Sequence, residues 1–398
     1  MAVTPPDPHA HWRRNQAAVT VAVFIGYASF TLVMPFLPLY FRDLGVRDTG
    51  AIAIWSGLSL GVTPAITAAV APWWARLAER YGRKLMVARS LASFVVVMAL
   101  LAAVRAPWQV LALRTLLGFF AGYGTVALVM AAESSPREHM ATAIAWVQTA
   151  LRLGPALGPV IGGTLAATVG LRETFVVASV CYLVALLLVI FGYHEARQPE
   201  QGHQEPLISF RELRRLPHFT LFLGIVFGLQ LVDRSFGPIL PLYLGEIGTA
   251  ASKVPFLSGV IFTVAAAAAA MGNQVNGWFI ARFGIRRVLT VASLVASVPA
   301  LVFGFGPPTL VLAASAIVFG FAVGLATTTV YTAAGRDVDH AARGVVFGYL
   351  TTSYLAGLAV SPVIAGFIGS VSNRTVFFVD AASLCVVAAI IHRKMADP

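Results

Sequence analysis

The chain has 398 residues, of which 58% are hydrophobic and only 11% are charged. Soluble chains carry about 25% charged residues, so this composition excludes a water-soluble surface and predicts a membrane protein. The apolar residues come in runs of about 20 rather than alternating stretches of about 10, which favours membrane-spanning helices over barrel strands. The net charge of +11 comes from Lys and Arg in short segments between these runs, so we expect membrane topology, not nucleic-acid binding, to explain it.

Twelve charge-poor windows follow one another along the chain, each long enough to cross about 30 Å of hydrocarbon. They lie at about 17–41, 51–75, 85–104, 107–131, 141–169, 174–192, 218–244, 255–280, 288–306, 310–332, 345–370 and 375–392. The longest polar interruption falls between the sixth and seventh windows. The sequence therefore predicts an all-α membrane protein of twelve transmembrane helices, with an N-terminal six-helix bundle over 1–192, a cytoplasmic central linker over 193–217 and a C-terminal six-helix bundle over 218–398.

The distribution of Lys and Arg predicts the orientation. The termini and even-numbered loops hold 18 of the 28, the odd-numbered loops hold 6, and 4 lie inside predicted helices. Because loops rich in Lys and Arg remain on the cytoplasmic side, we expect both termini to be cytoplasmic.

The two halves repeat each other at an offset of 202 to 203 residues. Transporters commonly arise by such duplication. We therefore expect two parallel bundles related by a pseudo-twofold axis along the membrane normal. The matched pieces are Pro35–Tyr40 with Pro238–Tyr243, Ala75–Lys84 with Gly277–Arg286, Gly118 and Gly122 with Gly320 and Gly324, and Pro159 and Gly163 with Pro362 and Gly366.

A charged motif occupies the loop between the second and third predicted helices. Ala75–Lys84 is similar to the loop motif G-x-L-A-D-R-x-G-R-K of the major facilitator superfamily, with Ala75 in place of Gly and Glu79 in place of Asp. Its cations can snorkel to the headgroups and reach a carboxylate at a neighbouring helix end, for which Glu133 is the expected partner. A topology anchor without switching is the alternative. The predicted cytoplasmic gate comprises Glu79, Arg80, Gly82, Arg83, Lys84 and Glu133.

A second motif lies in the fifth predicted helix. Gly154–Gly163 resembles the G-P-x-x-G-P-x-x-G-G signature of the twelve-helix drug:proton antiporters, among which the similarity is to MdtG-type multidrug efflux transporters. Glycines at helical spacing allow another backbone to approach, and prolines weaken the hydrogen-bond ladder of a helix. Tight packing without a conformational role is the alternative. The predicted hinge motif comprises Gly154, Pro155, Gly158, Pro159, Gly162 and Gly163.

Charges inside the predicted helices indicate the transport site, because an unpaired charge at the bilayer centre costs from about 3 to more than 10 kcal/mol. Asp233 and Arg234 lie about 15 Å along the helix from Tyr243, near the midplane. Adjacent helical residues point about 100° apart, so we expect partners on other helices. A static ion pair is the alternative role for Asp233, and Asp380 is expected to be a structural acid. The predicted proton-coupling or substrate site comprises Asp233, Arg234, Arg114, Arg152 and Gln230, and Arg114 also matches the family's helix-four arginine.

The resemblance covers the whole chain and implies the major facilitator fold and a secondary active transporter. Proton-coupled efflux of amphipathic drugs or other small organic molecules by alternating access is the favoured function. A nutrient or metabolite uptake symporter or facilitator of the same fold is the alternative.

Other classes find little support in the sequence. A P-loop needs Gly directly before Lys, whereas Lys84, Lys253 and Lys394 follow Arg, Ser and Arg. All eight histidines lie in loops, termini or helix ends, which argues against a membrane-embedded enzyme or metal centre. We expect no cofactor and no metal. The expected partners are a small-molecule substrate, protons and the lipid bilayer of the plasma membrane, with a monomeric chain and no nucleic acid.

Overall fold

The computed structural model describes residues 11–33, 35–136, 138–194, 218–336 and 343–395. Within these ranges every regular element is helical, and 11 helical segments are long and apolar enough to cross a bilayer. The twelfth crossing is α7 (Met140–Thr168), whose 29 residues extend about 43 Å at 1.5 Å per residue. The chain is thus an all-α membrane protein with twelve membrane-spanning helices, as predicted.

The first bundle contains six crossings, of which two are built from two consecutive helices. Its helices are α1 (Trp12–Leu32) and α2 (Leu37–Asp43), α3 (Thr49–Tyr81), α4 (Arg83–Ala103), α5 (Pro107–Phe120) and α6 (Tyr123–Ser134), α7, and α8 (Leu171–Leu187) with a π-helical last turn, Leu188–Gly192.

The second bundle repeats this arrangement, with one divided crossing. Its helices are α10 (Phe219–Asp233) and α11 (Phe236–Glu246), α12 (Val254–Phe283), α13 (Ile285–Gly304), α14 (Thr309–Arg336), α15 (Arg343–Val371) and α16 (Asn373–Lys394). Apart from Tyr193 and His194, the expected linker 193–217 lies outside the described residues, so the domain boundaries stay a prediction.

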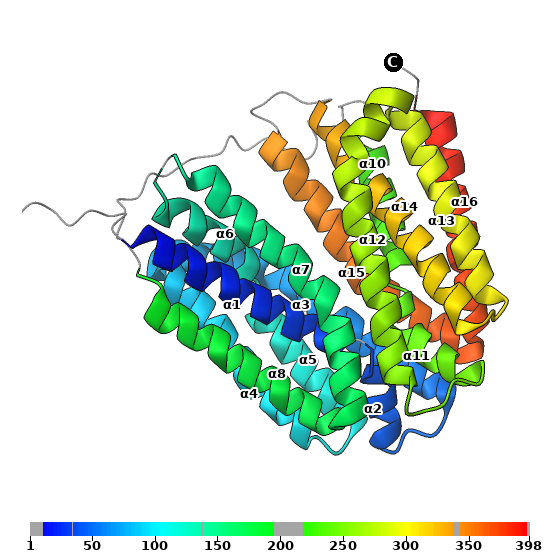
Figure 1. Cartoon of the computed structure of the whole chain (residues 1–398), viewed down its shortest axis with the longest axis horizontal. Coiled ribbons are helices and arrows are strands. Elements are labelled where there is room, and N and C mark those ends of the chain that lie inside the picture. The colour runs from blue at the N-terminus through cyan, green and yellow to red at the C-terminus, as the bar shows by residue number, and fades with distance from the viewer. Residues whose placement is uncertain (1–10, 34, 137, 195–217, 337–342, 396–398) are drawn as a thin grey trace, which may run out of the picture.

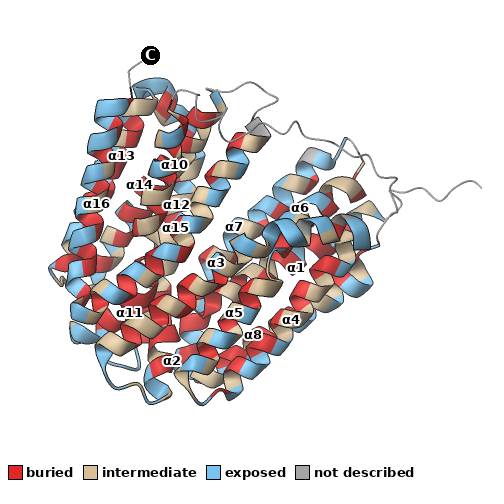
Figure 2. Cartoon of the chain, turned by 180° about the vertical axis from the view of Figure 1, so that it is seen from behind, coloured by how far each residue is buried: buried red, intermediate tan, exposed pale blue. Residues whose placement is uncertain are grey.

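Figure 1 shows the two bundles side by side, meeting at one end and diverging toward the other. We call the end at which α1 begins and α16 finishes the terminal end, and the end that carries α2 and α11 the distal end. Large hydrophobic side chains such as Val96, Val298 and Leu310 are exposed. Figure 2 shows exposed residues along the outer helices of both bundles. In a soluble protein such faces would be buried, so they are the surfaces expected to contact lipid.

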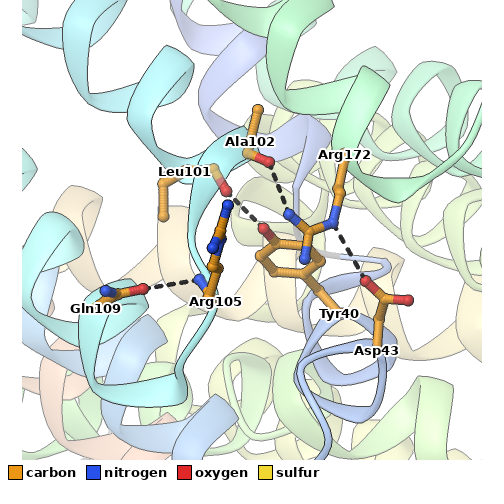
Figure 3. Close-up of polar contacts among 7 residues, drawn as sticks. All are labelled: Tyr40, Asp43, Leu101, Ala102, Arg105, Gln109 and Arg172. Carbon is orange, nitrogen blue, oxygen red and sulfur yellow. Dashed lines mark hydrogen bonds and ion pairs between the residues drawn. The ribbon is translucent and has the colours of Figure 1, made fainter.

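A polar connection ties three helices together at the distal end of the first bundle (Figure 3). The Tyr40 hydroxyl on α2 donates to the Leu101 carbonyl on α4 at 2.6 Å. Arg172 at the start of α8 donates to the Ala102 carbonyl at 3.2 Å and lies 3.5 Å from the Asp43 carboxylate. These bonds fix the short helix α2 to its own bundle.

The second bundle has the same connection at the repeat offset. The Tyr243 hydroxyl donates to the Phe303 carbonyl, and Arg374 Nε lies 3.4 Å from the Glu246 carboxylate, which also accepts from Asn373 at 3.1 Å. Tyrosine, acid, arginine and carbonyl thus recur on matching elements. The repeat seen in the sequence is a structural repeat that includes side-chain contacts.

The bundles meet through α3 and α15 in the distal half of each helix. A Cβ atom at Gly57 would collide with the Pro362 carbonyl, and one at Gly61 would collide with the Ala359 carbonyl. Near the distal tip, a Cβ atom at Gly50 would also collide with the Ser370 carbonyl. Glycine is required here because the two backbones touch.

The second contact between the bundles joins α7 and α12, again in their distal halves. Gly163 lies against the Pro255 carbonyl, and Gly259 lies against the Pro159 carbonyl. The Val160 N–H donates to the Thr263 hydroxyl oxygen across this contact at 3.2 Å. The molecule is therefore closed at the distal end.

We expect Gly259→Ala to move the population away from this closed state, because its methyl group would collide with the Pro159 carbonyl of the other bundle. Gly277→Ala on the same helix is the matched control, since a Cβ atom there meets nothing within 4 Å. Spin-label distances between positions 47 and 371 measure opening at the distal end. An unchanged distance distribution in Gly259→Ala would contradict the assignment of this contact as the closure.

Candidate functional site

The centre of the predicted site lies where the seventh crossing is divided. Pro238 has no N–H to donate to the Arg234 carbonyl, which instead accepts from the Gly237 N–H at 3.4 Å. Helix α10 consequently ends at Asp233, and α11 begins at Phe236. The charged pair thus occupies the interruption of a helix inside the membrane-spanning part, an arrangement typical of transporter binding sites.

Asp233 and Arg234 pair with each other, at 3.0 Å between Nε and Oδ2. Arg234 keeps a helical backbone conformation and donates its N–H to the Gln230 carbonyl at 3.1 Å, so the two side chains meet although they start from adjacent helical positions. The Arg234 guanidinium also donates to the Tyr354 hydroxyl on α15 at 3.3 Å. About 30% of each charged side chain stays exposed, 31% for Arg234 and 28% for Asp233. The pair therefore remains accessible to a solute.

A second acid lies beside this interruption and was expected to be a structural residue of a helix end. Asp380 on α16 is buried, 5% exposed, and its Oδ2 lies 2.5 Å from the Ser235 hydroxyl, next to Arg234 in the chain. Among the described residues no cation lies within ion-pair distance of Asp380. The sequence spacing placed Asp380 near the end of its helix, whereas the fold brings Asp380 against Ser235, where the seventh crossing is divided.

The hydrogen count at Ser235 indicates the protonation state of Asp380. The Ser235 hydroxyl lies 2.8 Å from the Val232 carbonyl and 2.5 Å from Asp380, but it has one hydrogen to donate. Both contacts are hydrogen bonds when Ser235 donates to Val232 and a protonated Asp380 donates to Ser235. An unpaired buried carboxylate would be costly, which favours the same arrangement.

The other predicted site residues are scattered. Arg114 on α5 is buried and donates to the Ser59 carbonyl on α3 at 2.6 Å, which is the helix-packing role. Gln230 is buried on α10, and its Oε1 has no hydrogen-bond partner in the described part of the chain. Arg152 lies at an exposed position of α7, and its place in the site stays a prediction. Sequence reasoning also missed Arg89, a cation within α4.

The charged motif at the terminal end is organised around the turn between α3 and α4. Gly82 makes this turn at φ +90°, a conformation that side-chain-bearing residues rarely adopt. Arg83 forms an ion pair with Glu133 at the end of α6, and Lys84 donates to the Tyr193 carbonyl at 2.6 Å. All of these contacts lie within the first bundle.

The remaining gate residues are less constrained. Arg80 is exposed near the end of α3, and the side chain of Glu79 lies outside the described part. In the second bundle Arg286 matches Lys84 and likewise donates to a helix-end carbonyl, that of His392, at 2.7 Å. Ile285 stands at the position of Arg83, so the ion pair is specific to the first bundle. The gate stays a prediction.

The helix-five motif divides its glycines between two neighbours. Cβ atoms at Gly154, Gly158 and Gly162 would collide with α1, whereas Gly163 faces α12 of the other bundle. Pro159 leaves the Pro155 carbonyl without its helical donor, and the Thr31 hydroxyl lies 3.4 Å from that oxygen. Helix α7 remains continuous through both prolines. The motif is thus a packing surface in this state, and its hinge role stays a prediction.

We expect Ser235→Ala to lower the melting temperature of the purified protein, because loss of the hydrogen bond to a buried carboxyl group costs about 1–3 kcal/mol. Asp380→Asn retains the shape and a donor for Ser235, so its effect should be smaller. Thr149→Ala is the control, since this exposed threonine donates to the Ala145 carbonyl in its own helix. A larger loss in Asp380→Asn than in Ser235→Ala would contradict a protonated Asp380.

Sequence comparison places these features in a known family. The profile described as Major Facilitator Superfamily matches residues 19–251 and 222–396. The Multidrug resistance protein MdtG of Salmonella dublin is 32% identical over 384 residues, which cover 95% of each chain. MdtG of Dickeya zeae is 32% identical over 381 residues, covering 94% of this chain and 93% of the relative.

Solved structures share the fold at low sequence identity. A bacterial homologue of the human lysosomal transporter Spinster, inward-facing and occupied, superposes with a TM-score of 0.78 at 17% identity and 98% coverage of both chains. A D-xylose-proton symporter superposes with a TM-score of 0.74 at 12% identity, covering 98% of this chain and 99% of the other. The chain therefore belongs to the Major Facilitator Superfamily and is a multi-pass secondary transporter of small molecules.

Proposed function

We propose that this transporter exports amphipathic drugs or other small organic molecules in exchange for protons. The observation that carries the proposal is the similarity to multidrug resistance proteins over 95% of both chains. Uptake is the second candidate, because a proton symporter for a sugar has the same fold. The helix-five motif, which resembles the signature of the drug:proton antiporters, favours export.

The proposed orientation puts both termini in the cytoplasm of a cell whose plasma membrane the monomeric chain spans. The excess of Lys and Arg at the terminal end supports this orientation. The state closed at the distal end is then inward-facing. In alternating access the contacts of α3 with α15 and of α7 with α12 separate, and the terminal ends approach one another.

Asp233 is the proposed coupling acid. It lies at the divided helix, it is partly exposed, and its counter-ion Arg234 also contacts Tyr354 on another helix. The ionised Asp233 carboxylate would accept from a donor group of the substrate, whereas a proton on Asp233 would occupy the oxygen that the substrate uses. Binding of proton and substrate would thereby compete, as antiport requires.

We expect the wild-type protein in proteoliposomes to accumulate substrate against its gradient when a pH gradient is imposed. In Asp233→Asn the rate of this accumulation should be at least tenfold lower. Asp233→Asn keeps the shape of the side chain but cannot titrate, so substrate binding should be largely retained. Asp43→Asn, which alters an ion pair at the distal end, is the matched control.

The direction of coupled movement separates the two functions. Substrate and protons that move in opposite directions support export, whereas movement in the same direction would establish uptake. Proton-driven export by a well-folded Asp233→Asn protein would remove Asp233 from the mechanism. A fall in folded yield would instead indicate that Asp233 is the fixed counter-ion of Arg234.

The terminal-end motif is the proposed gate. The Arg83–Glu133 ion pair is already present in the inward-facing state and lies within one bundle, so it cannot act by bridging the bundles. Its proposed role is to hold the turn at Gly82 so that Arg80 and Glu79 meet the second bundle when the terminal ends close. A contact made in only one state shifts the equilibrium toward that state.

We expect Arg80→Ala, Arg83→Ala and Glu133→Ala to increase the inward-facing population. Arg76→Ala is the control, because this exposed arginine donates to the Pro72 carbonyl of its own helix at 3.3 Å. Spin-label distances between positions 138 and 336 report the separation of the terminal ends. Equal populations in the variants and the wild type would reduce the motif to a topology anchor.

A further inference from the structure

Arg89 is a cation inside the first bundle that neither the transport site nor the gate uses. It lies six residues after the start of α4, about 9 Å along the helix axis. Its guanidinium stacks on Trp74 of α3, with Cζ 3.0 Å from the ring centroid. No acid of the described chain lies within ion-pair distance of it. The charge therefore lacks the counter-ion that a membrane-spanning segment normally supplies.

Of the three guanidinium nitrogens of Arg89, one has a hydrogen-bond acceptor among the described residues. Nη2 donates to the Phe120 carbonyl at 3.3 Å and to the Ser90 hydroxyl at 3.1 Å. Nε and Nη1 are fully buried and have no hydrogen-bond partner within the described residues. Buried guanidinium donors without an acceptor are costly, so they indicate a missing partner.

A cavity of about 60 Å³ adjoins these donors. Arg89, Ser90 and Thr125 contribute polar groups to its lining, and residues such as Trp74 and Met86 contribute apolar groups. Gly122 and Thr125 are exposed, so the cavity lies at the surface of the bundle. Its volume suits one small charged group attached to an apolar body that stays outside.

The cavity also faces the division of the fourth crossing. Gly122 adopts φ +109° between α5 and α6, and the first N–H groups of the 12-residue α6 have no acceptor within their own helix. The positive end of this helix dipole adds to the charge of Arg89. Both features attract an anion, and they come from different parts of the chain.

The second bundle shows that packing alone does not require this arrangement. At the repeat offset of 202, Val291 stands where Arg89 stands and is 56% exposed, and Gly324 stands where Gly122 stands. Helix α14 runs without interruption through Gly324. The cation and the helix division therefore occur together in the first bundle, and both are lacking at the equivalent place of the second.

We propose that Arg89 and the start of α6 form a binding site for the anionic oxo group of an amphiphile that approaches from the bilayer. The chemistry recognised is a phosphate or carboxylate, held by Nε and Nη1 of Arg89. The phosphate of an anionic phospholipid is the favoured source, because the site lies close to the terminal-end surface of the bilayer. A carboxylate-bearing solute and free phosphate share that chemistry.

The purified full-length chain in detergent, with thermal unfolding as the readout, tests the site. Dioleoylphosphatidylglycerol should raise the melting temperature by several degrees more than dioleoylphosphatidylcholine does. Arg89→Gln should lower the apparent affinity for the anionic lipid at least tenfold, and Arg89→Lys should retain part of it. Arg287→Gln, which removes an exposed arginine at the terminal end of the other bundle, controls for general attraction of anionic lipid.

A second variant covers the case in which Arg89→Gln fails to fold. Thr125→Leu fills the cavity without touching the Arg89 bond to Phe120, and it should abolish the lipid-specific shift. Thr351→Leu, at an exposed threonine of α15 that bonds its own helix, is its control.

Separate arms with oleate and with sodium phosphate identify the source of the anion. An Arg89-dependent shift with either probe supports the site and broadens its ligand. The proposal is overturned if both lipids stabilise equally, or if the shift persists in both Arg89→Gln and Thr125→Leu. Neither outcome bears on proton-driven transport.

Discussion

Inside a bilayer a backbone N–H or C=O group finds no water, so each interruption of a helix must supply its own hydrogen-bond partners. The protein interrupts its fourth and seventh crossings within the membrane-spanning part. At the seventh, the Arg234 carbonyl accepts from Gly237. At the fourth, the Phe120 carbonyl accepts from Ser90 and Arg89. Polar side chains therefore gather where the backbone ladder is broken, and the same places offer charge to a ligand.

The duplicated architecture separates features that maintain the fold from features that distinguish the two halves. The hydrogen bonds from the Tyr40 and Tyr243 hydroxyls to the ends of α4 and α13 recur in both bundles. Lys84 and Arg286 likewise each donate to a carbonyl group near the end of the last helix of their bundle. The Asp233–Arg234 pair, the Arg83–Glu133 pair and the cation Arg89 each occur in one bundle alone among the described residues. Contacts that are present in both bundles therefore maintain the fold, whereas features present in one bundle are the candidates for transport or ligand binding.

The sequence predicted the fold well because it follows from composition, window length and repetition. The site was predicted less well because it depends on where helices end. Pro238, four residues after Arg234, was the available signal that α10 ends at Asp233. Arg89 lies inside the third predicted window, but no sequence motif indicated a role for it, because the cavity beside it forms only where α3, α4 and α6 pack together. The burial of Asp380 against Ser235 depends on packing of distant segments, which a single sequence does not display.

The position of the glycine contacts turns α3 into a lever. Its 33 residues reach from the distal tip to the turn at Gly82. From Gly57, where it touches α15, to Tyr81 the axis extends about 36 Å at 1.5 Å per residue. A tilt of about 10° around that contact moves the far end of α3 through about 6 Å, roughly the rise of one helix turn. A small displacement at the α3–α15 contact can thereby change the separation of the bundles at the terminal end. One added methyl group at Gly57 would then alter the width of the opening there.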